Sequence, residues 1–440
     1  MSKILFTARS GMSILGGMTG FLVAAIMIGV PIAFALLFSG AASALMIGGS
    51  ATDPQIIATQ LLRGTDSLSM MALPFFILTG ELMNRGGITQ RLIALANVSV
   101  GRIRGGLGYV TILVTMLFGA LVGSAVASTA ALGAILIPMM VNSGYNREKA
   151  AGLVAGTNII TPIMPPSVPL IVYGATAGVS ITQLFMGGIV PAFYLVLLMG
   201  ATWWFVSRKD AVRSDVPWPG MLGFLKLLGG AFWAILLPVI ILVGLRSGVF
   251  TATEAGVIAA VYALFVGGVI YRELDMKVII RALVSSAKMS AVVMFLAATA
   301  QVAGYFMTIS GLPGVVTSIM EPFIDKPKLL VLVLMIFVFL LGFILDVIPT
   351  ILILTPLVIP VLQTAGVDLV YFGIIFTLAN VLGLITPPVG PSLNVASAVG
   401  NVRIEAVAKT VLPYLISQCV LVLLFVAFPG LITVPLGWLT

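Results

Sequence analysis

The sequence contains no histidine and a single cysteine, Cys419, among its 440 residues. Without histidine, a metal-dependent membrane enzyme would lack one of its commonest zinc ligands. One cysteine cannot form an internal disulfide, and the apolar surroundings of Cys419 indicate a small core residue. No glycine–lysine dipeptide occurs, so the sequence lacks the phosphate-binding loop motif of an ATP-driven pump. These absences argue against an enzyme and against ATP hydrolysis.

Charge is also scarce, at 8% of residues, whereas 60% of residues are hydrophobic. The mean hydropathy is strongly positive. A soluble protein of this size could not bury so much apolar surface, but a lipid bilayer accepts it. The 47 glycines and 24 prolines suit a packed bundle of membrane helices. The composition predicts an all-α polytopic membrane protein.

The net charge of +8 does not indicate a nucleic-acid partner, because the basic residues occupy short loops beside apolar runs. They gather mainly around residues 85–104, 208–226 and 272–288. Such clusters are typical of the cytoplasmic loops of a polytopic membrane protein. The partner that the charge pattern predicts is therefore the lipid bilayer.

A proline-rich break occurs twice within long apolar runs. It reads TNIITPIMPPSVP at 157–169 and ANVLGLITPPVGP at 379–391, and its prolines are 222 residues apart (387 − 165). The same offset pairs Asn158 with Asn380. A duplicated, broken membrane segment is typical of the binding site of a secondary transporter.

The duplication divides the chain into two membrane repeats. We expect an N-terminal repeat at 1–206, a cytoplasmic linking loop at 207–226 and a C-terminal repeat at 227–440. The broken helices are expected at about 150–174 and 369–400.

Two further runs, at about 107–145 and 329–366, carry polar residues and glycine or proline near their centres. Each half has about 15 residues, or about 22 Å of helix, which is shorter than a membrane core of about 30 Å. This favours two re-entrant hairpins that turn within the membrane, where protein or a water-filled cavity must satisfy the backbone. Two full spans joined by a tight external turn remain the alternative.

The proline clusters are expected to free backbone carbonyls, because each proline removes a hydrogen bond to the residue four positions earlier. A freed carbonyl inside a membrane is costly unless another group coordinates it, and Na⁺ is a natural partner. The opposite ends of the broken helices expose N–H groups that suit an anionic substrate. The carbonyls concerned are those of Thr161, Pro162, Pro165, Gly383, Leu384 and Pro387.

Two acidic residues lie inside apolar runs and have competing interpretations. Asp346 stands at the centre of the second hairpin, where it serves either a bound cation or the start of the following half-helix. Glu81 is four residues before Arg85, a spacing that predicts a structural ion pair at least as strongly as a functional acid.

The chain resembles the DctM-like family, the large membrane subunits of tripartite ATP-independent periplasmic (TRAP) transporters. The resemblance extends over nearly the whole chain. It rests on GVPIAFAL at 29–36, LPFFILTGELM at 73–83, GGI at 86–88, GSAVASTAALG at 123–133, PIMPPSVPLIVYG at 162–174, LDVIPTILILTP at 345–356 and ITPPVGPSLNV at 385–395.

This resemblance implies a translocating subunit with an inverted repeat, two re-entrant hairpins and an elevator movement. It also implies a separate small four-helix membrane subunit (DctQ-like), a periplasmic substrate-binding protein (DctP-like) and a Na⁺ gradient that drives uptake of an organic acid. No cofactor other than the coupling ion Na⁺ is expected. C4-dicarboxylates, sialic acid and other sugar acids all fit the family.

Carried onto matching positions, the resemblance implies two Na⁺ sites and a substrate site between the two breaks. The first Na⁺ site comprises Ser124, Ser128, Thr129, Asn158, Thr161 and Pro162. The second comprises Asp346, Thr350, Asn380, Gly383 and Thr386. The substrate is expected near Pro165, Pro166, Ser167, Pro387 and Pro388.

Other classes of transporter remain open. A stand-alone sodium- or proton-coupled anion transporter of the wider ion-transporter superfamily would share the inverted repeat without needing a binding protein. A channel is a third possibility. Proton coupling is less favoured because histidine is absent, although Asp346 keeps it open.

Overall fold

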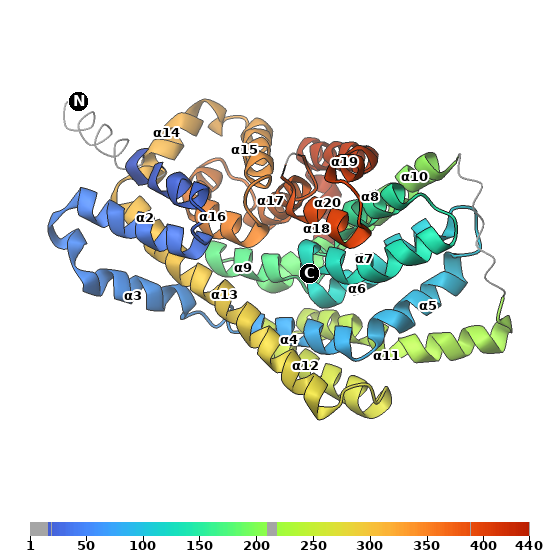
Figure 1. Ribbon diagram of the computed structural model, residues 1–440. Helices are drawn as coiled ribbons and strands as arrows, with labels where there is room; N and C mark the ends of the chain where they lie inside the picture. The colour runs from blue at the N-terminus through green and yellow to red at the C-terminus, as the bar shows by residue number, and fades with distance from the viewer. Residues whose placement is uncertain (1–15, 19, 209–217, 388, 440) are drawn as a thin grey trace.

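A computed structural model gives the fold (Figure 1) and describes residues 16–18, 20–208, 218–387 and 389–439, without the side chains of Ser50 and Leu121. This part of the chain consists of helices and their connections, with no β-strand. Within it, seven helices are long and apolar enough to cross a membrane: Ala125–Asn142, Ile181–Ser207, Gly220–Arg246, Ala252–Ile270, Met276–Ile309, Val347–Thr364 and Ile404–Ala427. The predicted all-α, multi-pass class is confirmed.

One group of helices packs around the long helix α13 (Met276–Ile309), which runs obliquely across the molecule in Figure 1. Helices α2, α3 and α4 contact α13 directly, α12 packs on α4, and α11 packs on α5. The bounds of these helices are α2 (Ile32–Ile47), α3 (Pro54–Thr65), α4 (Ala72–Arg85), α5 (Ile88–Val100), α11 (Gly220–Arg246) and α12 (Ala252–Phe265).

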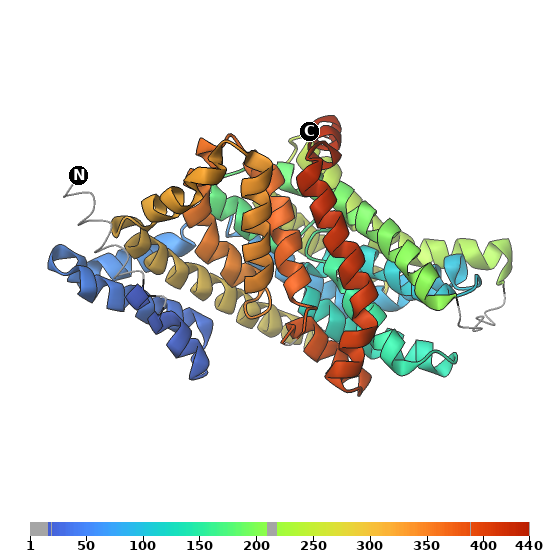
Figure 2. The same cartoon turned by 90° about the horizontal axis from the view of Figure 1, so that it is seen from above.

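The second group contains two helical hairpins and two interrupted helices, seen from above in Figure 2. The hairpins are α6–α7 and α15–α16, and the interrupted pairs are α8–α9 and α17–α18. Helices α10, α14, α19 and α20 complete the group. Their bounds are α6 (Gly106–Val122), α7 (Ala125–Asn142), α8 (Arg147–Thr157), α9 (Val168–Ala177), α10 (Ile181–Ser207), α14 (Leu312–Ile324), α15 (Pro327–Leu341), α16 (Val347–Thr364), α17 (Leu369–Gly383), α18 (Pro391–Gly400), α19 (Ile404–Ala427) and α20 (Gly430–Leu439).

The duplication seen in the sequence recurs in the helix boundaries. Helices α7 and α16 differ by 222 residues at both ends (347 − 125 and 364 − 142), and α8 and α17 start 222 residues apart (369 − 147). Equivalent N-cap residues explain these boundaries, because short polar side chains accept hydrogen bonds from the first free N–H groups of a helix. Ser124 caps α7 and the equivalent Asp346 caps α16. Asn146 caps α8 and the equivalent Asp368 caps α17.

The two interrupted helices are joined directly through Tyr173 of α9. Its fully buried hydroxyl donates a 2.8 Å hydrogen bond to the carbonyl of Leu369, at the start of α17. A side chain at Gly373 would overlap the Tyr173 ring, so the glycine allows this close packing. The two breaks are therefore held at a fixed separation by a contact between the halves of the chain.

We expect Tyr173→Phe to destabilise the protein by about 0.5–1.5 kcal/mol, because the hydrogen bond from the buried Tyr173 hydroxyl to the partly buried Leu369 carbonyl is lost. The measurement is the apparent melting temperature in detergent. Tyr194→Phe is the matched control, since no hydrogen bond of the Tyr194 hydroxyl occurs within the described residues. An equal change in both variants would contradict a specific role for the Tyr173 bond.

Candidate functional site

The tip of the first hairpin packs against the first helix break. Gly123 turns the chain between α6 and α7 with a positive φ of 65°, and a Cβ there would lie 3.0 Å from the backbone nitrogen of Val168. Gly119, one turn earlier, approaches the Cα of Thr161 so closely that a Cβ would lie 2.9 Å from it. Glycine thus lets the hairpin backbone rest on the break itself.

Hydroxyl groups join the two elements beneath this contact. The hydroxyls of Ser128 and Thr161 are 3.0 Å apart and both side chains are fully buried. Ser128 also donates to the carbonyl of Ser124 at 2.6 Å, and Thr161 donates to the carbonyl of Asn158 at 2.6 Å. The structure therefore brings together four of the six residues predicted for the first cation site.

Asn158 contributes an acceptor that no donor satisfies. Its amide nitrogen donates to the carbonyl of Val154 at 2.7 Å, whereas its buried amide oxygen has no hydrogen-bond partner in the described structure. Thr129 is also buried, but its hydroxyl donates to the carbonyl of Ala125 in its own helix at 2.7 Å. The vacant oxygen next to the break is therefore that of Asn158.

The second hairpin meets the second break through two glycines. A Cβ at Gly342 would overlap the carbonyl of Asn380, and a Cβ at Gly383 would lie 2.5 Å from the Cα of Gly342. Both amide atoms of Asn380 are buried without partners among the described residues. The two equivalent asparagines thus each present an unsatisfied amide oxygen beside a hairpin tip.

The other residues predicted for the second cation site lie at the same junction or along its helices. Asp346 caps α16 by accepting a 2.7 Å hydrogen bond from the Val347 N–H, as its structural interpretation predicted. Thr350 donates to the carbonyl of Asp346 at 2.9 Å, and Thr386 donates to the carbonyl of Leu382 at 2.7 Å. Their hydroxyl oxygens keep lone pairs free for a further interaction.

The prediction that proline breaks leave carbonyls without donors is wrong at three positions. The Gly383 carbonyl accepts the Thr386 N–H, and the Leu384 carbonyl accepts the Ser392 N–H, both at 3.0 Å. The Ser167 hydroxyl donates to the carbonyl of Pro162. Turns and a serine N-cap replace the lost helical bonds at these three positions. No donor to the other three carbonyls, those of Thr161, Pro165 and Pro387, occurs among the described residues.

A cavity of about 400 Å³ lies between the two hairpin tips, and we call it the tip cavity. Ser124 of the first tip and Asp346 of the second both line it, together with the first break. Its opposite wall comes from helices α4 and α13 of the other group. Its polar lining is confined to a few groups, including Ser124, Asp346, Glu81 and Asn84, on otherwise largely apolar walls.

The described residues predicted for the substrate, at 165–167 and Pro387, do not form the wall of this cavity. The first break lines it with Pro162, Val168 and Pro169, whereas residues 165–167 are fully buried behind them. Pro387 is exposed at the second break. Pro388 lies outside the described residues.

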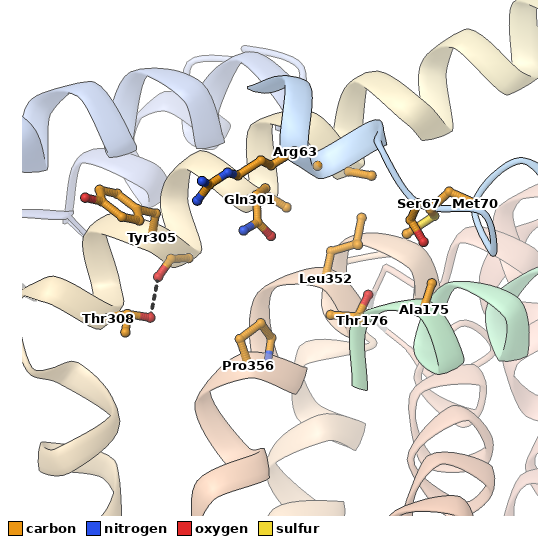
Figure 3. Close-up of a pocket in the computed structure, with 14 residues that line it drawn as sticks. Arg63, Ser67, Met70, Ala175, Thr176, Gln301, Tyr305, Thr308, Leu352 and Pro356 are labelled. Atoms are coloured by element: carbon orange, nitrogen blue, oxygen red, sulfur yellow. Dashed lines mark hydrogen bonds between the residues drawn. The ribbon is translucent and has the colours of Figure 1, made fainter. Parts of the chain in front are cut away.

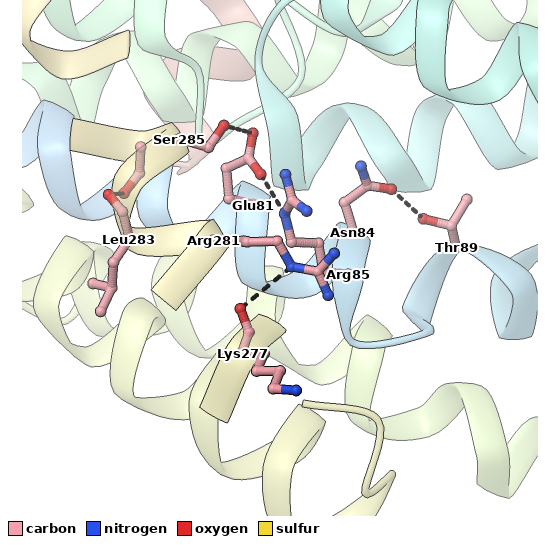
Figure 4. A network of polar contacts seen from close by, with 9 residues as sticks. Glu81, Asn84, Arg85, Thr89, Lys277, Arg281, Leu283 and Ser285 are labelled. Carbon is pink, nitrogen blue, oxygen red and sulfur yellow. Dashed lines mark hydrogen bonds and ion pairs between the residues drawn. The ribbon is translucent and has the colours of Figure 1, made fainter. Parts of the chain in front are cut away.

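A polar network holds α4 against α13 at the rim of the tip cavity (Figure 4). Glu81 accepts a 2.9 Å ion-pair hydrogen bond from Arg85 and a 3.0 Å hydrogen bond from the hydroxyl of Ser285. Asn84 accepts a 3.3 Å bond from Thr89 in α5. The structural ion pair predicted for Glu81 is confirmed, and Ser285 links it to α13.

Comparison with known proteins identifies the family. The model of the tripartite ATP-independent periplasmic transporter, DctM component, matches residues 19–431. The chain belongs to this family. One relative is a Haemophilus influenzae protein that is provisionally named a TRAP transporter large permease. It is 47% identical to this chain, over 95% of this chain and 98% of the relative. The 2,3-diketo-L-gulonate TRAP transporter large permease protein YiaN of Escherichia coli is 45% identical over 96% and 98%.

The fold of this DctM-family permease is shared more widely. The YdaH transporter of Alcanivorax borkumensis superposes with a TM-score of 0.66 at 15% identity, over 92% of this chain and 98% of that one. At that identity the likeness concerns the fold alone.

Sequence reasoning missed several polar groups of the permease. Ser392, beside the second break, and Thr355, on α16, have buried hydroxyls without partners in the described structure. The cavity wall supplied by Met289 and Val293 of α13 was also missed. A serine or threonine in a helical sequence gives no sign that its hydroxyl lacks a hydrogen-bond partner, because this depends on how the helices pack. The wall residues of α13 lie outside the duplicated motifs of both repeats.

Proposed function

We propose that the chain is the translocating subunit of a Na⁺-coupled TRAP transporter that imports a small organic acid anion. The observation that carries this proposal is the pair of buried amide oxygens of Asn158 and Asn380. A buried polar group without a partner costs about 1–3 kcal/mol, and a bound cation would offset that cost. Two equivalent positions with the same vacancy, beside the same kind of hairpin tip, favour two cation sites.

Each proposed site combines one vacant amide oxygen with oxygens that can turn toward a cation. In the first, these belong to Ser124, Ser128 and Thr161, and in the second to Asp346 and Thr350. One Asp346 oxygen binds the Val347 N–H, and the second carboxylate oxygen has no partner among the described residues. Hard cations prefer oxygen donors of this kind.

The hairpin tips support a re-entrant arrangement within an inverted repeat. Both tips line one cavity and each rests on the middle of an interrupted helix, as expected of turns inside a membrane rather than at its surface. We propose that the second group of helices, including the hairpins and breaks, moves as an elevator against the group around α13. In this proposal residues 1–206 and 227–440 are the two repeats, linked by 207–226.

The tip cavity is the proposed substrate site, with the first break at Pro162, Val168 and Pro169 as one wall. The name of the E. coli relative favours a sugar acid as the substrate class. We further propose that a separate small membrane subunit and a periplasmic binding protein complete the transporter in the bacterial inner membrane.

The test is uptake of 2,3-diketo-L-gulonate into proteoliposomes that contain this chain and the small subunit. We expect saturable uptake that requires both a Na⁺ gradient and the binding protein. Uptake that needs Na⁺ but no binding protein would favour a stand-alone transporter. A sustained substrate current without saturation would favour a channel, and either result would contradict the proposal.

A further inference from the structure

A second cavity, of about 320 Å³, lies beside Arg63 of α3, and we call it the Arg63 cavity (Figure 3). Its wall carries the guanidinium of Arg63, the amide of Gln301 and hydroxyl groups that include those of Ser67 and Thr176. No acidic residue lines it. Its chemistry therefore differs from that of the tip cavity, which Glu81 and Asp346 line.

The two cavities follow one another along the same helices. Helix α9 lines the tip cavity with Pro169 and the Arg63 cavity with Thr176, seven residues later. Helix α13 does so with Val293 and Gln301, eight residues apart. At 1.5 Å per helical residue, these separations correspond to about 10–12 Å. The Arg63 cavity thus lies about 10–12 Å from the tip cavity along these two helices.

Arg63 is available to an external anion. The described structure contains no ion pair or hydrogen bond to its guanidinium, and Asp66, three residues on, does not pair with it. In Figure 3 the side chains of Arg63 and Gln301 stand on one side of the space, opposite Thr176 and Pro356. A planar guanidinium presents paired donors that match a carboxylate, and an adjacent amide adds a donor.

Close helix packing brings together the backbone segments that carry this pair. A Cβ at Gly64 would lie 2.7 Å from the Cα of Ala298 and 2.9 Å from the Cβ of Gln301. The glycine therefore brings the backbone of α3 onto α13. Arg63 and Gln301 are consequently neighbours because of rigid helices rather than a chance side-chain orientation.

We propose that the Arg63 cavity is a second, carboxylate-binding site, which an organic acid anion occupies on its way to or from the tip cavity. This role rests on the proposed import of organic acids. The binding chemistry itself rests on Arg63, Gln301 and the absence of acidic residues from the cavity wall. Carboxylate binding here requires no Na⁺, because none of the residues of the proposed cation sites lines the Arg63 cavity.

The test uses Ser67→Cys in a Cys419→Ser background, which places a single thiol in the cavity wall. Its rates of modification by 2-sulfonatoethyl methanethiosulfonate (an anion) and 2-(trimethylammonium)ethyl methanethiosulfonate (a cation) are compared in lipid nanodiscs. We expect Arg63→Gln to lower the ratio of anionic to cationic rates roughly tenfold, and Arg63→Lys to keep most of it. Succinate or gluconate, at constant ionic strength, should slow modification only when Arg63 is present.

Leu68→Cys in the same background is the matched control, because Leu68 is exposed beside Ser67 and does not line the cavity. Succinate should not protect it. If neither anion protects Ser67→Cys, or if Arg63→Gln leaves the rate ratio unchanged, the site is refuted. Because labelling needs no ion gradient, protection together with Na⁺-independent uptake would refute the proposed coupling while leaving this site intact.

Discussion

Replacing Asn380 or Asn158 with leucine is expected to abolish the stabilisation that Na⁺ gives this protein through the site concerned. Leucine has nearly the same shape but no amide oxygen, so each variant loses the acceptor that is buried without a partner. In a K⁺ buffer Asn380→Leu should be at least as stable as the parent chain, because an unsatisfied buried amide has been removed. Asn158→Leu removes an unsatisfied oxygen but also the hydrogen bond from the Asn158 amide nitrogen to the Val154 carbonyl, so its stability should change little. Apparent melting temperatures across a Na⁺ titration should show an affinity lowered roughly tenfold or more.

Asn97→Leu provides the control for this experiment. The amide oxygen of Asn97 is likewise buried without a partner in the described structure, but Asn97 lies on α5, away from both breaks. It should leave the Na⁺ titration unchanged. A Na⁺ response that survives in both Asn158→Leu and Asn380→Leu would refute the two proposed cation sites.

Gly383→Ala is expected to reduce uptake at least tenfold and to shorten the lifetime of the folded protein in detergent. The new methyl group would overlap the backbone of Gly342, which cannot rotate away as a side chain could. Either the second hairpin moves off α17 or the tip cavity changes shape, and overpacking of this kind typically costs about 1–3 kcal/mol. The measurements are initial uptake rates and the half-life of the monodisperse protein at fixed temperature.

Gly314→Ala separates this clash from the general effect of removing a glycine. A Cβ at Gly314, on α14, would meet no atom within 4 Å. Because alanine favours helix more than glycine does, this control should be neutral or slightly stabilising. Gly383 also ends a helix, so backbone propensity alone predicts the same mild result there. Equal behaviour of the two variants would contradict the importance of the contact between Gly342 and Gly383.

The sequence carries local signals for the points at which its helices are interrupted. Proline clusters forbid a continuous helix, and Ser124 and Asp346 are good N-caps, so the interruptions and the starts of α7 and α16 could be located from residue types. The 222-residue offset then relates the interruptions in the second half of the chain to those in the first half. The family resemblance assigned Ser128 and Thr161 to one site, and their hydroxyls lie 3.0 Å apart.

The remaining features depend on packing between distant segments. The free carbonyls predicted at Pro162 and Gly383 were satisfied by a serine N-cap and a turn, which proline spacing alone does not reveal. The α4 and α13 walls of the tip cavity come from segments about 200 residues apart, joined by Glu81 and Ser285. No local pattern indicates that these helices face the hairpins.

The sharing of one cavity by both hairpin tips has a thermodynamic consequence. A ligand in the tip cavity contacts walls whose positions are also set by the two junctions at Asn158 and Asn380. If an ion bound at either junction raises the affinity for the transported anion by some factor, the bound anion must raise the affinity for that ion by the same factor. The strength of coupling can therefore be measured from either side, by titrating cargo at fixed salt or salt at fixed cargo, and the two values must agree.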